Sequence, residues 1–444
     1  MDTPSQPHPK DAGADLNDPN SSARATSPLQ RRFAIYLLLF GAICAGMGQT
    51  IVFSVLPPLA RQIGLTNFQV GSIFMFSAIG WVVTGPRWGR MSDRRGRKPF
   101  IIIGMLGFAA SMLFFGVSVQ LGLVGLLAGL PLYLLMVVTR SLNGIIGSAG
   151  PPAAQAYIAD RTSQSDRTAG IAGFSAAFGF GAMLGPGFGA ATSLIGPIVP
   201  FYANAALGMI MLITVLRFLP ERTGPTQRKK QQKVKLLDQR IFPFLIFALA
   251  FGILNAIPIQ TIAFYFIDRL GYENDEATHF VSIGLTAGAL SSLFGQLVIV
   301  QRFRLPPARL MRIAPVLLLI GHVLIFANAE LVPVIAGLMI SGLGAGLAMP
   351  AATAAASMRV QSDEQGGAIG LANSAGATGF IISPIVGFSL YEWSPAAPYI
   401  LTASIAALLI IYAWTSKAVK NAVPATEDVP PPEAVADPAA APYQ

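Results

Sequence analysis

Long segments without a charged residue recur along this chain of 444 residues. A helix needs about 20 apolar residues to cross a bilayer, and it satisfies its backbone hydrogen bonds within its own segment. The uncharged stretches can be divided into such lengths. We therefore expect an all-α membrane protein with twelve transmembrane helices, at 33–56, 68–88, 99–119, 132–158, 169–192, 200–219, 241–266, 277–300, 310–328, 331–356, 366–390 and 396–416.

Composition excludes several other classes of protein. Only 11% of the residues are charged, against about 25% in a soluble globular protein. The single Cys44 excludes an internal disulfide, a CxxC redox pair and a structural zinc site, and three histidines leave little for metal binding. The sequence contains no G-x-x-x-x-G-K-[ST] phosphate loop and no intramembrane pair of His, Asp or Glu. We expect neither an enzyme nor a resident cofactor or metal.

Lysine and arginine are distributed unevenly between the two sides of the expected bundle. One side carries nearly all of them, including Arg87–Lys98 and the basic segment 220–240, whereas the other has only Arg61 and Arg269. The positive-inside rule places both termini, which share the basic side, in the cytoplasm. The basic segment is short and lacks interleaved aromatic residues, so we expect a solvated loop and no nucleic-acid partner.

Internal repeats divide the chain into two halves. Pro152-Ala153-Ala154 recurs 198 positions later as Pro350-Ala351-Ala352, and Gln49-Thr50-Ile51 recurs 211 positions later as Gln260-Thr261-Ile262. Parallel repeats of this kind place a substrate site near the midplane, between halves that rock to give alternating access. The expected organisation is a disordered tail, a six-helix half, a basic cytoplasmic loop, a second six-helix half and a second disordered tail, at 1–32, 33–219, 220–240, 241–416 and 417–444. Residues 119–131 are apolar but needed by neither neighbouring span.

The connection between the second and third spans carries the clearest motif. It reads Gly89-Arg90-Met91-Ser92-Asp93-Arg94-Arg95-Gly96-Arg97-Lys98, which resembles the signature loop G-x-x-x-D-R-x-G-R-[KR] of the major facilitator superfamily. The resemblance covers residues 33–416 and implies a gating latch that uses Gly89, Asp93, Arg94, Gly96, Arg97 and Lys98. It also implies that Asp93 lies against the start of the eleventh span at Gln365, which leaves Arg94 or Arg97 to pair with Asp160. The corresponding loop from Gly295 to Arg302 lacks the acid, so one latch is expected.

Arg140 lies inside the fourth expected span and begins Arg140-Ser141-Leu142-Asn143-Gly144. This resembles the superfamily's R-x-x-x-G motif of the fourth helix. An arginine at membrane depth is costly and marks a functional site by default. The other interpretation is a side chain that extends to the outer interface. We favour a role in a polar cavity, near Gln49 or Gln260.

Gly181, Gly185 and Gly189 share one face of the fifth expected span, next to Pro186. A glycine face lets a neighbouring helix approach closely, and the proline kinks the helix. The pattern resembles the G-x-x-x-G-P-x-x-G motif of drug:proton antiporters, the tetracycline-efflux-like group, and implies export. Ordinary small-residue packing explains the glycines but does not require the Gly-Pro pair.

No acidic residue lies at membrane depth, although proton-coupled exporters of this family commonly carry one in the first or fourth span. His322 and Asp93 are the remaining candidates for the coupling proton. The expected function is proton-coupled export of drug-like or amphipathic small molecules by a monomer in the lipid bilayer of the inner membrane, driven by the proton gradient. The alternative is import or exchange of a small solute, including an anionic one. Expected cavity residues are Gln49, Thr50, Arg140, Asn143, Asn255, Gln260, Thr261 and His322.

Overall fold

The computed structural model describes residues 28–162, 167–220, 235–303, 305–361 and 364–420. It divides into two compact units: unit 1 is Met1–Lys229 with Tyr272–Thr286, and unit 2 is Lys230–Gly271 with Ala287–Gln444. The two expected tails, apart from residues 28–32 and 417–420, lie outside the described residues. So does most of the expected central loop.

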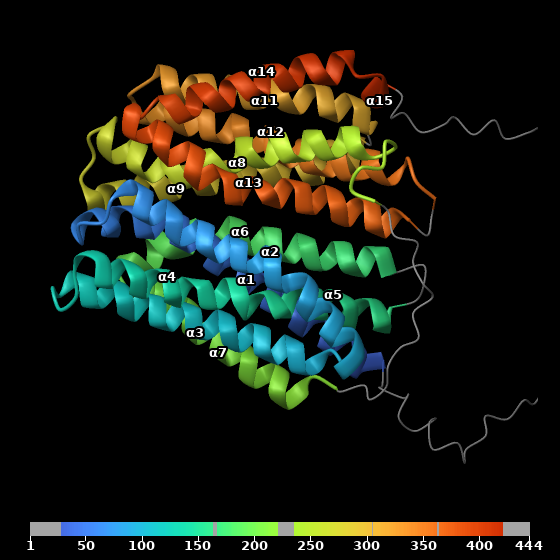
Figure 1. Cartoon of the computed structure of the whole chain (residues 1–444), viewed down its shortest axis with the longest axis horizontal. Coiled ribbons are helices and arrows are strands. Elements are labelled where there is room, and N and C mark those ends of the chain that lie inside the picture. The colour runs from blue at the N-terminus through green and yellow to red at the C-terminus, as the bar shows by residue number, and fades with distance from the viewer. Residues whose placement is uncertain (1–27, 163–166, 221–234, 304, 362–363, 421–444) are drawn as a thin grey trace, which may run out of the picture. The chain divides into compact units, whose positions relative to one another are not determined.

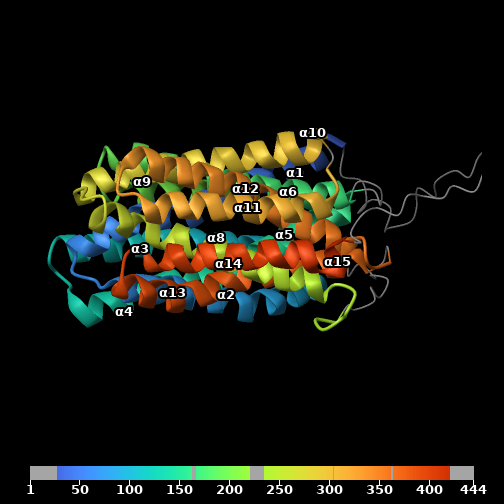
Figure 2. The ribbon, with the colours of Figure 1, turned by 90° about the horizontal axis from the view of Figure 1, so that it is seen from above.

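Unit 1 is built from long helices that run beside one another (Figure 1, Figure 2). They are α1 (Pro28–Gln62), α2 (Asn67–Arg95), α3 (Lys98–Leu123), α4 (Gly129–Ile145), the short η2 (Gly147–Ala149), α5 (Gly150–Arg161), α6 (Arg167–Ser193) and α7 (Val199–Phe218). α4, η2 and α5 together occupy the fourth expected span, and their break coincides with Gly147, Gly150 and Pro151.

Unit 2 has the same kind of architecture. Its helices are α8 (Phe242–Asp268), α9 (Asn274–Phe294), η3 (Gly295–Val300), α10 (Gln301–Phe303), α11 (Pro307–Ala327), α12 (Leu331–Ser357), α13 (Gln365–Trp393), α14 (Ala397–Thr415) and α15 (Lys417–Lys420). α9 begins with residues of unit 1 and ends in unit 2. Within the described ranges there is no β-strand.

Eleven helices in the described part of the chain are long and apolar enough to cross a membrane. α6 is not one of them, although its 27 residues cover the fifth expected span. The prediction of an all-helical membrane protein is confirmed, and the count of twelve is supported approximately.

Several helix ends differ from the expected boundaries because a helix can continue beyond the hydrocarbon. α1 begins at Pro28, within the expected tail, and α2 continues through the charged motif to Arg95. α3 extends to Leu123, so part of the unassigned segment 119–131 lengthens the third helix. Gly295–Val300, at the end of the expected span 277–300, forms a π-helix.

Each unit has its own apolar interior. In unit 1, Leu38, Phe100, Tyr157, Met211 and Val215 belong to one buried cluster. In unit 2, a second cluster includes Phe244, Phe247, Met311, Leu347 and Leu409. Large apolar side chains also remain exposed along whole helix faces, as Ile210, Ile213 and Leu216 do on α7. Such faces suit contact with lipid chains.

Glycines bring equivalent pairs of helices into close contact in the two units. In unit 1, a Cβ on Gly181 of α6 would lie 1.9 Å from the carbonyl oxygen of Ile43 in α1. In unit 2, a Cβ on Gly379 of α13 would lie 2.1 Å from the backbone of Gly252 in α8. Gly181 and Gly379 are 198 positions apart. The sequence repeat therefore coincides with a repeated packing contact.

We predict that Gly181→Ala destabilises the protein, because the added methyl group collides with the backbone of Ile43 rather than with a flexible side chain. Overpacking of this kind costs about 1–3 kcal/mol. Gly179→Ala, on the same helix, is the matched control because a Cβ at Gly179 meets nothing within 4 Å. Apparent melting temperature and folded yield in detergent compare the two. Equal melting temperatures would contradict the close contact.

Candidate functional site

Arg140 of α4 is buried in unit 1, with 1% of its surface exposed. Its Nη2 donates a hydrogen bond of 3.0 Å to Oε1 of Gln49 on α1. Its Nε and Nη1 have no hydrogen-bond partner among the described residues. The structure thus brings together two of the residues that the sequence analysis selected and leaves two guanidinium donors unused.

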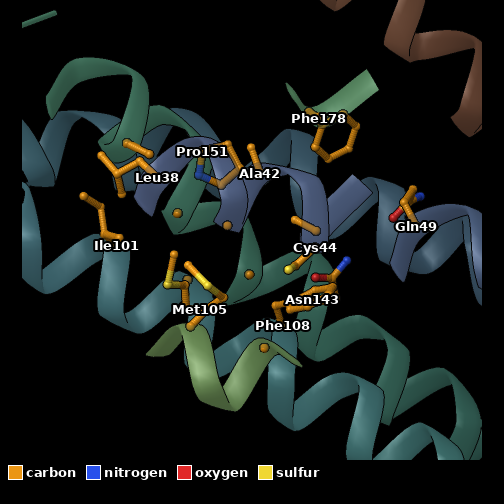
Figure 3. Close-up of a pocket in the computed structure, with 18 of the residues that line it drawn as sticks. Leu38, Ala42, Cys44, Gln49, Ile101, Met105, Phe108, Asn143, Pro151 and Phe178 are labelled. Atoms are coloured by element: carbon orange, nitrogen blue, oxygen red, sulfur yellow. The ribbon is translucent and has the colours of Figure 1, made fainter. Parts of the chain in front are cut away.

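A pocket opens beside this pair, inside unit 1 (Figure 3). Its wall is largely apolar, and the amides of Gln49 and Asn143 are the polar side chains that line it. Cys44, the chain's single cysteine, also lines it. In Figure 3, Leu38 and Ile101 lie at one end of the view and Gln49 at the other. The apolar wall is drawn from α1, α2, α3, η2, α5, α6 and α7, and includes Leu38, Trp81, Ile101, Met105, Phe108, Phe174, Phe178 and Met211.

Thr50, expected in the cavity, instead connects two helices. Pro186 has no N–H, so the carbonyl of Ala182, four residues earlier in α6, has no helical donor. The hydroxyl of Thr50 in α1 donates to that carbonyl at 2.8 Å. The glycine contacts allow this approach, since a Cβ on Gly185 would lie 2.0 Å from Oγ1 of Thr50. Gly189 faces α1 in the same way, since a Cβ there would lie 3.1 Å from the side chain of Val55.

The remaining expected cavity residues belong to unit 2. Gln260 is buried, and both atoms of its amide lack a partner within the described ranges. Thr261 donates to the carbonyl of Ile257 at 2.9 Å and lies 3.2 Å from the hydroxyl of Tyr399. His322 is buried, with Nδ1 unpartnered among those same residues, and Asn255 is half-buried. Their relation to the Arg140 site involves both units and stays a prediction.

The charged motif forms a compact network at the end of α2. Arg97 pairs with Asp93 and, through Nε, with Asp160 of α5 at 3.2 Å, while its Nη1 donates to Ser92 at 2.9 Å. Gly96 provides the turn with φ of 96° and ψ of 161°, a conformation that is essentially restricted to glycine. The expected pairing of Arg97 with Asp160 is therefore present within unit 1.

The other motif residues surround this network. Lys98 donates to the carbonyl of Leu216 at 3.1 Å, and Arg94 is exposed. Gly89 lies in α2, where a Cβ would lie 3.7 Å from the side chain of Pro152. The motif is therefore mostly helical, and its turn is confined to Gly96 and Arg97.

The start of α13, where the sequence analysis expected Asp93, carries a carboxylate of its own. Glu364 accepts two hydrogen bonds of 2.9 Å from Arg240, one to each carboxylate oxygen. Arg240 also donates to Asp238. These hydrogen bonds hold the pKa of Glu364 and of Asp238 below their usual values. The approach of Asp93 to α13 joins both units and stays a prediction.

Asn204 of α7 was missed by the sequence analysis. It is fully buried in unit 1, and neither amide atom has a partner in the part of the chain described. A Cβ on Gly48 would lie 2.3 Å from its Nδ2 and 2.6 Å from the ring of Phe108, so Asn204 lies close to the pocket wall. It is the one amide side chain in the mostly apolar helix Val199–Phe218, and this was the available signal.

We predict that Thr50→Val destabilises the protein because it leaves the carbonyl of Ala182 without a donor. A buried unsatisfied acceptor costs about 1–3 kcal/mol. Thr50→Ser, which keeps the hydroxyl, is the control. In a Pro186→Ala background the helix regains its own donor, so Thr50→Val should cost less there. Apparent melting temperatures of the four combinations measure the coupling. The same loss in both backgrounds would show that the two positions act independently.

We also predict unequal effects of neutralising the two acids that pair with Arg97. Asp160 is 8% exposed and Asp93 is 42% exposed. Asp160→Asn should therefore lower stability by about 1–3 kcal/mol, because the nearly buried guanidinium of Arg97 loses the better buried of its two carboxylate partners. Asp93→Asn should cost under about 1 kcal/mol, as exposed pairs do. Melting temperatures compare the variants, and a larger loss in Asp93→Asn would contradict the assigned burial.

Comparison with known proteins identifies relatives over most of the chain. The family model described as Major Facilitator Superfamily matches residues 38–307 and 279–440. Multidrug resistance protein 1 of Bacillus subtilis (strain 168) is 26% identical over 399 residues, which cover 88% of this chain and 98% of that protein. Quinolone resistance protein NorA of Staphylococcus aureus (strain N315) is 24% identical over 389 residues, which cover 85% and 95%.

Solved structures share the fold. A bacterial homologue of the human lysosomal transporter Spinster, in its inward-facing and unoccupied conformation, matches with a TM-score of 0.71 and 14% identity, covering 89% of this chain and 98% of that chain. The human organic anion transporter MFSD10 matches with a TM-score of 0.61 and 18% identity, covering 87% and 100%. At these identities the likeness establishes the fold alone.

Proposed function

We propose that this chain, which belongs to the Major Facilitator Superfamily, exports drug-like or amphipathic small molecules from the cell. Family membership makes it a multi-pass membrane transporter rather than an enzyme, as its sequence predicts. Export is supported by the similarity, over most of both chains, to multidrug and quinolone resistance proteins.

The observation that carries the proposal is the pocket of unit 1. Sites for drug-sized molecules are concave and mostly apolar, with a few polar groups that fix orientation. Here apolar side chains from six helices and from η2 surround two amides, and a buried arginine is bonded to one of them. The Gly-Pro motif supports the same function, since it packs α6 against α1, which supplies Gln49 and much of the pocket wall.

The energy source in this proposal is the proton gradient, and the transporter acts as a monomer in the inner membrane with both termini in the cytoplasm. Every Asp and Glu among the described residues lies near a helix end or in a connection between helices. We propose Asp93, at the cytoplasmic end of α2, or His322 as the group that carries the proton. If Asp93 forms the expected latch, Asp93→Asn slows transport while expression is unchanged.

Import or exchange of a small solute is the second candidate. The observation in its favour is the position of the charges: membrane depth holds a cation, Arg140, where proton-coupled exporters commonly hold an acid. Direction of transport separates the two candidates.

We predict that cells overproducing the protein accumulate less of a fluorescent amphipathic dye than cells with an empty vector. A protonophore should abolish the difference, since it removes the proposed driving force. Arg140→Ala should abolish it as well, and Arg140→Lys should retain part of it if the charge matters more than the guanidinium fork. Arg217→Ala, at an exposed arginine near the end of α7, is the control for loss of one charge. Raised accumulation would mean uptake and overturn export.

A further inference from the structure

The guanidinium of Arg140 has no counter-charge in the described part of the chain. Its hydrogen bond goes to the neutral amide of Gln49, and Nε and Nη1 have no acceptor there. The ion pairs that Arg97 and Arg240 form lie at helix ends. Arginine stays protonated in proteins, so it cannot relieve its own burial by losing the proton.

The uncompensated charge lies one hydrogen bond away from the polar end of the pocket, since Arg140 itself is not among the residues that line it. Gln49, whose Oε1 is 3.0 Å from Nη2 of Arg140, lines the pocket. Asn143 also lines it and follows Arg140 by three residues, so both lie on the same face of α4. An acidic group bound beside these two amides would meet the guanidinium by displacing the Gln49 oxygen from Nη2. The fork geometry of arginine suits a carboxylate, sulfonate or phosphate.

The rest of the pocket suits an apolar body. Leu38, Ile101, Met105, Phe108 and Phe178 form much of its wall, and Figure 3 shows them with the two amides around one cavity. Flat aromatic and branched aliphatic ligands gain from contact with such a surface.

We infer that this pocket selects amphipathic organic anions, with the acidic group on Arg140, Gln49 and Asn143 and the apolar body along α1 and α3. This deepens the proposed function by naming the class of substrate, and it rests on that function. A cationic drug would meet a buried like charge with no described carboxylate to offset it, and a neutral one would leave the guanidinium unpaired. An anion replaces the missing counter-charge, which makes the site favourable for both partners.

The experiment compares three ligands that share one naphthyl body: 1-naphthylacetate, 1-naphthylacetamide and the trimethylammonium derivative of 1-methylnaphthalene. Calorimetric titration of the full chain in an uncharged detergent at neutral pH measures each dissociation constant. The acetate should bind about tenfold or more tightly than the amide, as expected for a hydrogen bond to a charged group. The cation should bind more weakly than both.

Variants test whether the preference comes from Arg140. Arg140→Gln should bind the acetate and the amide with similar affinity, and Arg140→Lys should keep a reduced preference. Arg217→Gln, on the exposed end of α7, should keep the full preference and controls for net charge. Ala45→Leu, which narrows the pocket from α1, should weaken acetate and amide alike without changing their ratio.

If Arg140→Gln does not fold, the relative affinities of the wild-type protein for the three ligands decide whether the pocket prefers an anion. Equal affinity for the three ligands, tighter binding of the cation, or no binding of any of them would overturn the inference. So would a preference that survives in Arg140→Gln. Each of these results leaves dye export open, because export is measured separately in cells with and without a protonophore. Conversely, anion binding without export would retain the site and overturn the direction of transport.

Discussion

In hydrocarbon, a backbone carbonyl that its own helix leaves without a donor has to find one elsewhere in the protein. Pro186 creates such a carbonyl at Ala182, and Thr50 of the neighbouring helix supplies the donor at 2.8 Å. This bond forms only because Gly181 and Gly185 let the two helices approach to backbone contact. The proline, the glycines and the threonine therefore act together to hold α6 against α1. These two helices form one side of the pocket.

The need of polar groups in hydrocarbon for partners within the protein also governs where the charged side chains lie. Ion pairs stand at helix ends, where Arg97 joins α2 to α5 and Arg240 joins the approach of α8 to the start of α13. Water can reach these helix ends, so the ion pairs there connect neighbouring segments at a modest cost in desolvation. Arg140 is the exception, since it is held at depth by one amide. An arginine at so costly a position is better explained by a ligand that it binds than by a contribution to the stability of the fold.

The sequence predicted the spans well because absence of charge over about 20 residues reports directly on contact with lipid. It was less reliable at helix ends. The charged residues from Gly89 to Arg95 were assigned to a loop, but charge excludes a segment from the bilayer and not from a helix. The fifth-span motif predicted close packing and a kink, whereas the partner of Ala182 lies 132 positions away from it and is visible only in three dimensions.

The candidate site was predictable to the extent that polar residues are rare in apolar helices. Arg140, Gln49 and Asn143 were selected on that ground, and the structure places Gln49 and Asn143 in the wall of one pocket, with Arg140 bonded to Gln49. Asn204 carried the same signal but belongs to none of the repeats or motifs quoted above. The pairing of Arg240 with Glu364 had no sequence signal, because both residues lie among other charges near helix ends and are 124 positions apart.

Cys44 gives the pocket one more property. It is the chain's single thiol, it is 2% exposed, and it lines the pocket within the first helix. The chain therefore offers an alkylating reagent one defined position of attachment, at a thiol whose burial makes it slow to react. A ligand in the pocket should slow this reaction further, so the rate of alkylation at Cys44 reports on occupancy of the pocket.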